Sequence, residues 1–198
     1  MADERRDART IISTGIALGA LTAIGVAVFA LISRATSGGV ELVAQSVTVL
    51  IGGAIATYVP ARAVRPRGID AVGWSAFIGV IGAWTFTALD IVVLRPAGLY
   101  SWRWDAIGGG SGWWYIPVWW MGATLLAWLG GLVYAARVKG SNEVNPVALG
   151  GQAVGIAVLV FGIMALTHAT PLTAAAVALA FALAVVIQLP VTAVLSRR

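Results

Sequence analysis

The feature that most constrains this chain is a series of six apolar stretches, each about as long as a helix must be to cross a bilayer. They lie at about 11–33, 42–61, 71–94, 117–138, 146–167 and 171–195. Hydrocarbon offers no partner for backbone N–H and C=O groups, so such stretches satisfy these groups within α-helices. The sequence therefore predicts an all-α integral membrane protein, a six-transmembrane-helix bundle in which residues 1–198 form a single membrane domain.

Composition supports a membrane protein and excludes several other classes. Charged residues make up 11% of the chain and its mean hydropathy is +0.91, whereas about a quarter of the residues of a soluble domain are charged. The absence of cysteine excludes disulfides, thiolate metal sites and cysteine nucleophiles. The net charge of +5 comes from arginines beside the apolar stretches, so we expect lipid contacts and no nucleic acid. We expect a multi-pass protein of the cell membrane and favour a prokaryotic plasma membrane.

The distribution of basic residues predicts the orientation. With six spans both termini lie on one side, and ten of the thirteen basic residues then share that side. The positive-inside rule makes both termini cytoplasmic. The basic residues on that side are Arg5, Arg6, Arg9, Arg62, Arg65, Arg67, Arg137, Lys139, Arg197 and Arg198, against Arg34, Arg95 and Arg103 on the other.

Three helix starts carry sequence signals. Asp70 is a candidate N-cap for the third span, since its carboxylate can accept from the free N–H groups of the first turn. Asn145-Pro146 and Thr170-Pro171 each pair a capping side chain with a proline, which is favoured in the first helical position. We therefore expect the fifth and sixth spans to begin at Pro146 and Pro171.

An aromatic-rich loop separates the third and fourth spans. Residues 100–120 hold six of the nine tryptophans, and tryptophan concentrates where a protein passes from hydrocarbon to headgroups. Glycines at 108–110 and 112 would allow the loop to fold back over the outer end of the bundle as a lid or a docking plate. The tryptophans assigned to this role are Trp102, Trp104, Trp113 and Trp114.

Small residues spaced four apart predict close helix packing, because association in lipid depends on backbone approach. One stripe consists of Gly15, Gly19, Ala23 and Ala27, and another of Gly151 and Gly155. Such stripes either seal the bundle or dock a partner. We expect internal packing for most of them, and the first stripe, which persists over four turns, is the best candidate for a surface that meets another protein. Gln152 and Gln188 are expected to bond to each other or to backbone across the hairpin of the last two helices.

Asp90 is the one acidic residue that falls inside a predicted span, and ionisable residues are costly in lipid. It is either a wet interfacial carboxylate paired with Arg95 or Arg103, or a ligand or proton site. The possible outer-side site for a ligand or partner comprises Gln45, Asp90, Arg95, His168 and the four loop tryptophans. A solvated loop residue is the simpler interpretation of His168, the only histidine.

These observations favour a non-catalytic accessory or structural subunit of a larger membrane complex, with other membrane subunits or further copies of the chain as partners. We find no Ser-His-Asp set, glutamate pair or helical His-Glu motif. We therefore assign no catalytic, cofactor-binding or metal residue and name no cofactor, and an enzyme acting on lipids ranks last.

The alternative is a small solute-binding component or transporter. Six spans, cytoplasmic termini and about 200 residues resemble the substrate-capture subunits of energy-coupling-factor vitamin transporters. The resemblance covers size and topology. It implies that the small-residue stripe of the first helix docks on a transporter core.

Overall fold

The computed structural model describes residues 2–64, 69–99, 115–138 and 144–195. Within these ranges every regular element is helical, in the order α1 (Ala2–Ala35), α2 (Gly38–Ala63), α3 (Ile69–Leu89), η1 (Asp90–Leu94), α4 (Tyr115–Val138), α5 (Pro146–Leu166) and α6 (Ala174–Leu195). The short element η1 is a π-helical turn that continues α3 directly. The described part of the chain is thus an all-helical bundle.

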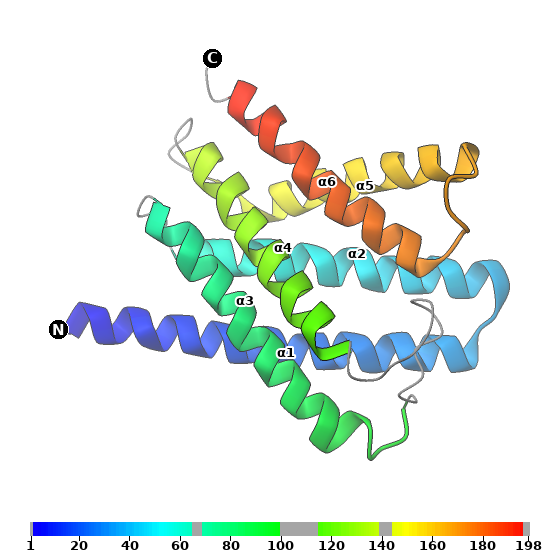
Figure 1. Ribbon diagram of the computed structural model, residues 1–198, viewed down its shortest axis with the longest axis horizontal. Coiled ribbons are helices and arrows are strands. Elements are labelled where there is room, and N and C mark those ends of the chain that lie inside the picture. The colour runs from blue at the N-terminus through cyan, green and yellow to red at the C-terminus, as the bar shows by residue number, and fades with distance from the viewer. Residues whose placement is uncertain (1, 65–68, 100–114, 139–143, 196–198) are drawn as a thin grey trace.

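Six of these helical segments are long and apolar enough to cross a membrane, with α3 and η1 acting as one span. The chain is a polytopic membrane protein. The first turn of α1 and the last turn of α6 lie toward the same end of the bundle (Figure 1), here called the proximal end. At the opposite end, here called the distal end, α1, η1 and α5 finish and α2, α4 and α6 begin.

Several helix boundaries differ from the expected ones. The charged segment before residue 11 is helical, because it contains good helix formers and no helix breaker. Asp70 is not an N-cap: α3 begins at Ile69, so Asp70 lies inside the first turn, where its charge still favours the helix dipole. Asn145 does cap α5, with Oδ1 accepting from the backbone N–H groups of Val147 at 2.9 Å and Ala148 at 3.4 Å.

The expected start of the last helix at Thr170-Pro171 is wrong. That helix, α6, begins at Ala174. Thr173 provides the cap, because its Oγ1 accepts from the backbone N–H of Ala176 at 3.3 Å. The capping threonine is therefore the one that directly precedes the alanine run.

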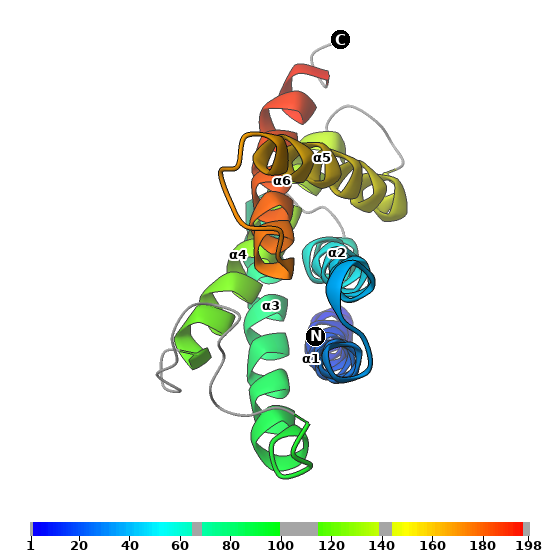
Figure 2. The same ribbon diagram turned by 90° about the vertical axis from the view of Figure 1, so that its right-hand side faces the viewer.

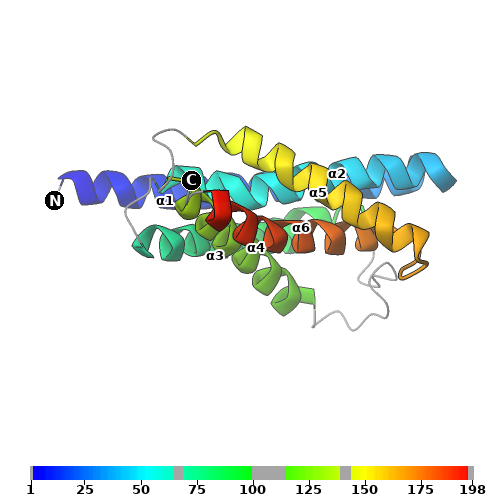
Figure 3. The same ribbon diagram turned by 90° about the horizontal axis from the view of Figure 1, so that it is seen from above.

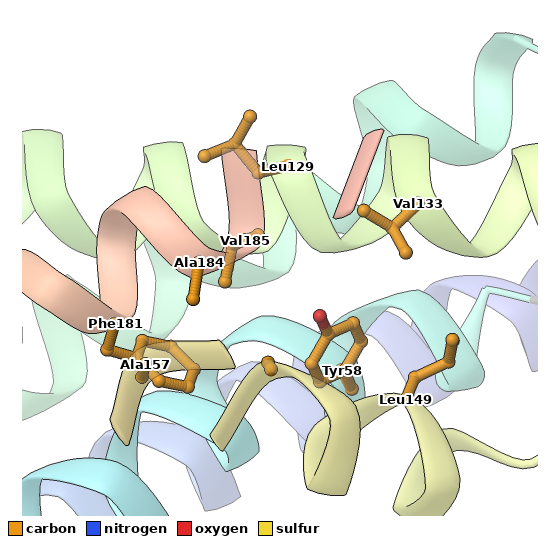
Figure 4. Packing of buried hydrophobic residues seen from close by; sticks show 9 residues of the cluster. Tyr58, Leu129, Val133, Leu149, Ala157, Phe181, Ala184 and Val185 are labelled. Atoms are coloured by element: carbon orange, nitrogen blue, oxygen red, sulfur yellow. The ribbon is translucent and has the colours of Figure 1, made fainter. Parts of the chain in front are cut away.

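The helices pack in two linked groups. α3 contacts mainly α1 and α4 and also α2, whereas α2 contacts α1, α4, α5 and α6 as well. From the distal side, α1 and α2 lie beside the α3–α4 pair, with α5 at the far edge from α1 (Figure 2). α5 crosses α2 when the bundle is seen from above (Figure 3). The largest buried cluster joins α2, α4, α5 and α6 around Tyr58 (Figure 4) and contains Tyr58, Leu129, Val133, Leu149, Ala153, Ala157, Phe181, Ala184 and Val185.

Two glycines allow the closest helix crossings. A Cβ placed on Gly130 of α4 would lie 1.9 Å from the carbonyl oxygen of Thr57 in α2. On Gly19 of α1 it would lie 2.5 Å from the carbonyl oxygen of Gly82 in α3. Backbones approach this closely only where no side chain intervenes, which is the packing mode expected in lipid.

The small-residue stripe of α1 is an internal contact. Gly15 and Gly19 face α3, Ala23 is buried, and Ala27 packs against the cluster around Phe86. The expectation that this stripe meets another protein is therefore wrong, because α3 already covers it. The transporter resemblance implies that this stripe docks on another protein, but α3 covers the surface that such docking would need.

The second expected stripe lies on the opposite face of its helix. Gly151 and Gly155 are exposed, and a Cβ on either would meet nothing within 4 Å. It is Gly150 that packs on α2, with a Cβ position 3.5 Å from Ala54 and 3.7 Å from Tyr58. Gly150 and Gly151 are adjacent, so a shift of one residue changes which face of α5 is buried.

Candidate functional site at the distal end of the third span

The strongest candidate site is the π-helical turn η1, where two charged residues are buried together. The Arg95 guanidinium donates through Nε to Asp90 Oδ2 at 2.7 Å. The side chain of Asp90 is 0% exposed and that of Arg95 7% exposed. A charge-assisted bond of this kind is strong where water is excluded, and separating the two charges there is costly.

The pairing with Arg95 expected from the sequence is confirmed. The expectation of a wet carboxylate is wrong, because protein atoms enclose Asp90 completely. One helical turn to either side along the chain, Phe86 and Leu94 are buried in an apolar cluster with Ala23 of α1, and Leu89 and Leu99 pack against it. Asp90 is thus a buried charge held by its partner on a span that packs against α1.

The backbone of η1 brings the two residues together. The N–H of Arg95 donates to the carbonyl of Asp90 at 3.0 Å, a bond that spans five residues and closes a π-turn. In an α-helix, residues five apart project about 140° from each other, since each residue turns the helix by roughly 100°. The π-turn is therefore the local geometry that places both side chains on one face.

The turn that follows ends the span in a Schellman motif. The N–H of Gly98 donates to the Arg95 carbonyl at 2.9 Å, and the N–H of Leu99 to the Leu94 carbonyl at 3.4 Å. Gly98 has the left-handed backbone (φ 63°) that this motif requires. The Arg34 guanidinium at the end of α1 donates to the Gly98 carbonyl. This bond ties the turn after η1 to α1.

A tryptophan joins α4 to α3 one turn before the ion pair. Trp120 Nε1 donates to Thr87 Oγ1 at 3.0 Å, and that hydroxyl donates to the Ala83 carbonyl at 2.8 Å. The rings of Trp120 and Trp84 lie 6.0 Å apart between centroids. Sequence reasoning assigned Trp120 to the aromatic loop and missed this contact. The sequence signal for this contact was Thr87, a polar side chain near the end of α3 that can accept from a tryptophan at the start of α4.

The other expected site residues do not all gather here. Gln45 Nε2 donates to Ser33 Oγ at 2.8 Å and to Glu41 Oε1 at 2.9 Å, joining the end of α1 to the start of α2. His168 is exposed in the turn between α5 and α6, which lies at the opposite edge of the distal end from η1 (Figures 1 and 2). The tryptophans Trp102, Trp104, Trp113 and Trp114 lie outside the described residues.

His168 follows Thr167, the C-cap of α5, and has a left-handed backbone (φ 54°). Its N–H donates to the Ala165 carbonyl at 3.2 Å, and that of Ala169 to the Met164 carbonyl at 3.0 Å, which is again a Schellman motif. The histidine therefore occupies the position that Gly98 occupies after η1. Across the described residues, no three His, Asp or Glu side chains converge in a way that could hold a metal ion.

Polar side chains near the proximal end are also paired. The Tyr58 hydroxyl donates to Gln188 Oε1, and Gln188 Nε2 donates to the Leu149 carbonyl at 3.1 Å. The expected backbone bond of Gln188 across the α5–α6 hairpin is confirmed, whereas Gln152 accepts from Arg137 Nη2 at 3.2 Å. In the centre, Ser75 Oγ donates to the Ala127 carbonyl at 2.8 Å. These bonds hold α2 to α6, α5 to α6, and α3 to α4.

No known protein family, curated protein or solved structure matches this chain.

Proposed function

We propose that this polytopic membrane protein is a non-catalytic accessory or structural subunit of a larger membrane complex, with its termini in the cytoplasm and its distal end outside. The observation that carries the proposal is the mutual pairing of the buried polar groups. Asp90 bonds to Arg95, Gln188 to Tyr58, and Ser75 to the Ala127 carbonyl. The bonds of Gln188 and Ser75 join different helices and specify how these pack, whereas a solute pathway directs its polar groups toward the solute.

The free face of α5 is where we expect a partner to bind. Gly151 and Gly155 lie there with Gly162, and a Cβ added to any of the three would have open space around it. α5 is also peripheral, with its main contacts to α2 and α6. A helix of another subunit can approach such a surface closely without meeting a side chain.

Gentle purification tests the proposal. We expect the protein to copurify with a membrane partner in fixed stoichiometry, and Gly151→Leu with Gly155→Leu to release that partner. Gly25→Leu is the matched control, because Gly25 of α1 also has open space but lies far from α5 in the sequence. A protein that purifies alone, in the same yield and size with or without the α5 changes, contradicts the proposal.

The second candidate is an outward-facing solute-binding component, favoured by the ionisable pair on a π-turn. π-bulges are frequent at functional sites, and ionisable residues inside a membrane mark ligand sites more often than not. If the protein is a solute-binding component, we expect a small molecule to be retained on purification. Replacing Trp113 and Trp114 by alanine should then abolish its retention and leave any protein complex intact, whereas in the accessory reading the same change dissociates the complex.

A further inference from the structure

The π-turn η1 holds one more residue than an α-helical turn. Its closing bond runs from the Arg95 N–H to the Asp90 carbonyl, whereas an α-helix would use the carbonyl of residue 91. The extra residue lies within a segment whose middle is lipid-accessible, since Val92 is 70% exposed. Packing on the outer side therefore does not confine the turn, and what holds it lies on the inner side.

On the inner side, the same two residues are joined a second time. The ion pair between Asp90 and Arg95 closes over the backbone bond between them. An α-helical register would turn the two side chains about 140° apart and break the ion pair. The ion pair therefore requires the π-turn.

A change of the turn to α-helical geometry, with all its residues kept, would rotate everything after it. The chain from Arg95 onward would turn by roughly 100°, which displaces a Cα by about 3.5 Å on a cylinder of radius about 2.3 Å. The Gly98 carbonyl would then leave the Arg34 guanidinium that it now accepts from. The π-turn and an α-helical turn of the same residues would therefore differ in the direction in which the chain leaves α3.

We infer that η1 is a two-register hinge, held in its π form by the Asp90–Arg95 ion pair. A change that separates the pair releases the turn to α-helical geometry and redirects residues 95–99. This inference does not depend on either proposed function, because it concerns the chain's own geometry. It gives the distal end a conformational device controlled by one buried carboxylate.

Spin labels can measure the register, because the chain has no cysteine and introduced ones are unique. One label is placed at Ala97, in the turn after η1, and the other at Val40, near the start of α2. Both residues are exposed. We expect Asp90→Leu to shift the main distance between the labels to a new value, since the side chain that holds Arg95 is lost.

Deleting Val92 changes the helical register of the turn and keeps both charged residues, so it tests the effect of the register alone. The deletion removes the extra residue and leaves Asp90 and Arg95 four positions apart, where an α-helix allows them to pair. We expect the deletion to keep the wild-type label distance, because residue 95 then lies about 40° from residue 90 in an α-helix, and Asp90→Leu to bring no shift in the deleted chain. If Asp90→Leu alone fails to fold, Asp90→Asn, which keeps the size of the side chain, replaces it.

Asp70→Asn is the matched control, because it removes an exposed carboxylate from the first turn of the same helix. We expect it to leave the label distance unchanged. The inference is overturned if Asp90→Leu folds and keeps the wild-type distance, or if it shifts the distance equally in the chain that lacks Val92. The first result would mean that packing of residues such as Phe86 and Leu94 sets the π-turn, and the second that the shift does not come from the helical register.

Discussion

Individual residues show how the bundle handles charge and backbone strain. The carboxylate of Asp90 is fully buried, while its partner Arg95 lies at the end of the span and carries a long flexible stem. Arginine can extend its guanidinium toward the headgroups when a partner is lost. Aspartate is too short to do so. The two members of the pair should therefore respond differently to removal of the other.

We predict that Arg95→Leu destabilises the protein much more than Asp90→Leu. Arg95→Leu leaves a buried carboxylate without its cation, which costs about 3–5 kcal/mol, whereas Asp90→Leu leaves an arginine that can reach the interface. The double replacement should recover most of the loss, because an apolar pair of similar volume often matches a buried ion pair. Unfolding in mixed micelles ranks the three variants. Equal losses for the two single changes would contradict the argument.

The two Schellman turns give a second prediction at this scale. His168 and Gly98 occupy equivalent positions with left-handed backbones, yet one carries a Cβ and the other does not. His168→Gly should raise the free energy of unfolding by about 0.5–1 kcal/mol, since a non-glycine residue pays about 1–2 kcal/mol for this conformation. Gly98→Ala should lower it by a similar amount. Ala169→Gly, next to His168, is the control and should bring no gain; a gain there would remove the conformational explanation.

Among whole elements, α5 shows why the buried faces of helices were hard to assign from the sequence. In a soluble helix the apolar face marks the core, but here the lipid-facing side is as apolar as the buried side. Val147, Leu159 and Leu166 of α5 all face outward. The positions of small residues were the remaining signal for the buried face. Because Gly150 and Gly151 are adjacent, they do not show which of two neighbouring faces of α5 is buried. Contacts such as Gly130 on Thr57 follow from three-dimensional packing.

Alanine substitutions should separate buried glycines from free ones. Gly130→Ala places a Cβ at 1.9 Å from the Thr57 carbonyl oxygen, so we expect a loss of at least about 1–3 kcal/mol from overpacking. Gly151→Ala meets nothing, so the isolated protein should be as stable as the wild type or slightly more stable, because alanine favours helix over glycine. Thermal unfolding of the isolated protein in detergent measures both. If Gly151→Ala lost as much stability as Gly130→Ala, the assigned faces of α5 would be wrong.

For the molecule as a whole, the lengths of the apolar stretches were enough to predict six helices. Pairing of Asp90 with Arg95 was one of the alternatives that the sequence left open, because a spacing of five residues brings two side chains together only through the π-turn. Helix ends were less predictable, because charged and polar residues such as those before Ile11 continue a helix beyond the hydrocarbon. The gathering of Gln45, Asp90 and His168 was an inference from shared depth. The depth of a residue in the membrane tells at which end of the bundle it lies. The arrangement of the helices decides at which edge of that end it lies, and His168 and η1 lie at opposite edges (Figure 2).

The last prediction concerns which end of the bundle faces the cytoplasm. Both ends of the described chain lie proximally, and the sequence predicts that ten of the thirteen basic residues lie on that side. Positive charge beside a span resists translocation, so the proximal end should stay in the cytoplasm. A cysteine at Ser37, exposed between α1 and α2, should react with an impermeant reagent on intact cells, and one at Ala8, exposed near the start of α1, only after permeabilisation. The reverse pattern would invert the orientation, and would place the Asp90–Arg95 hinge against the cytoplasm, where only an intracellular ligand or partner could act on it.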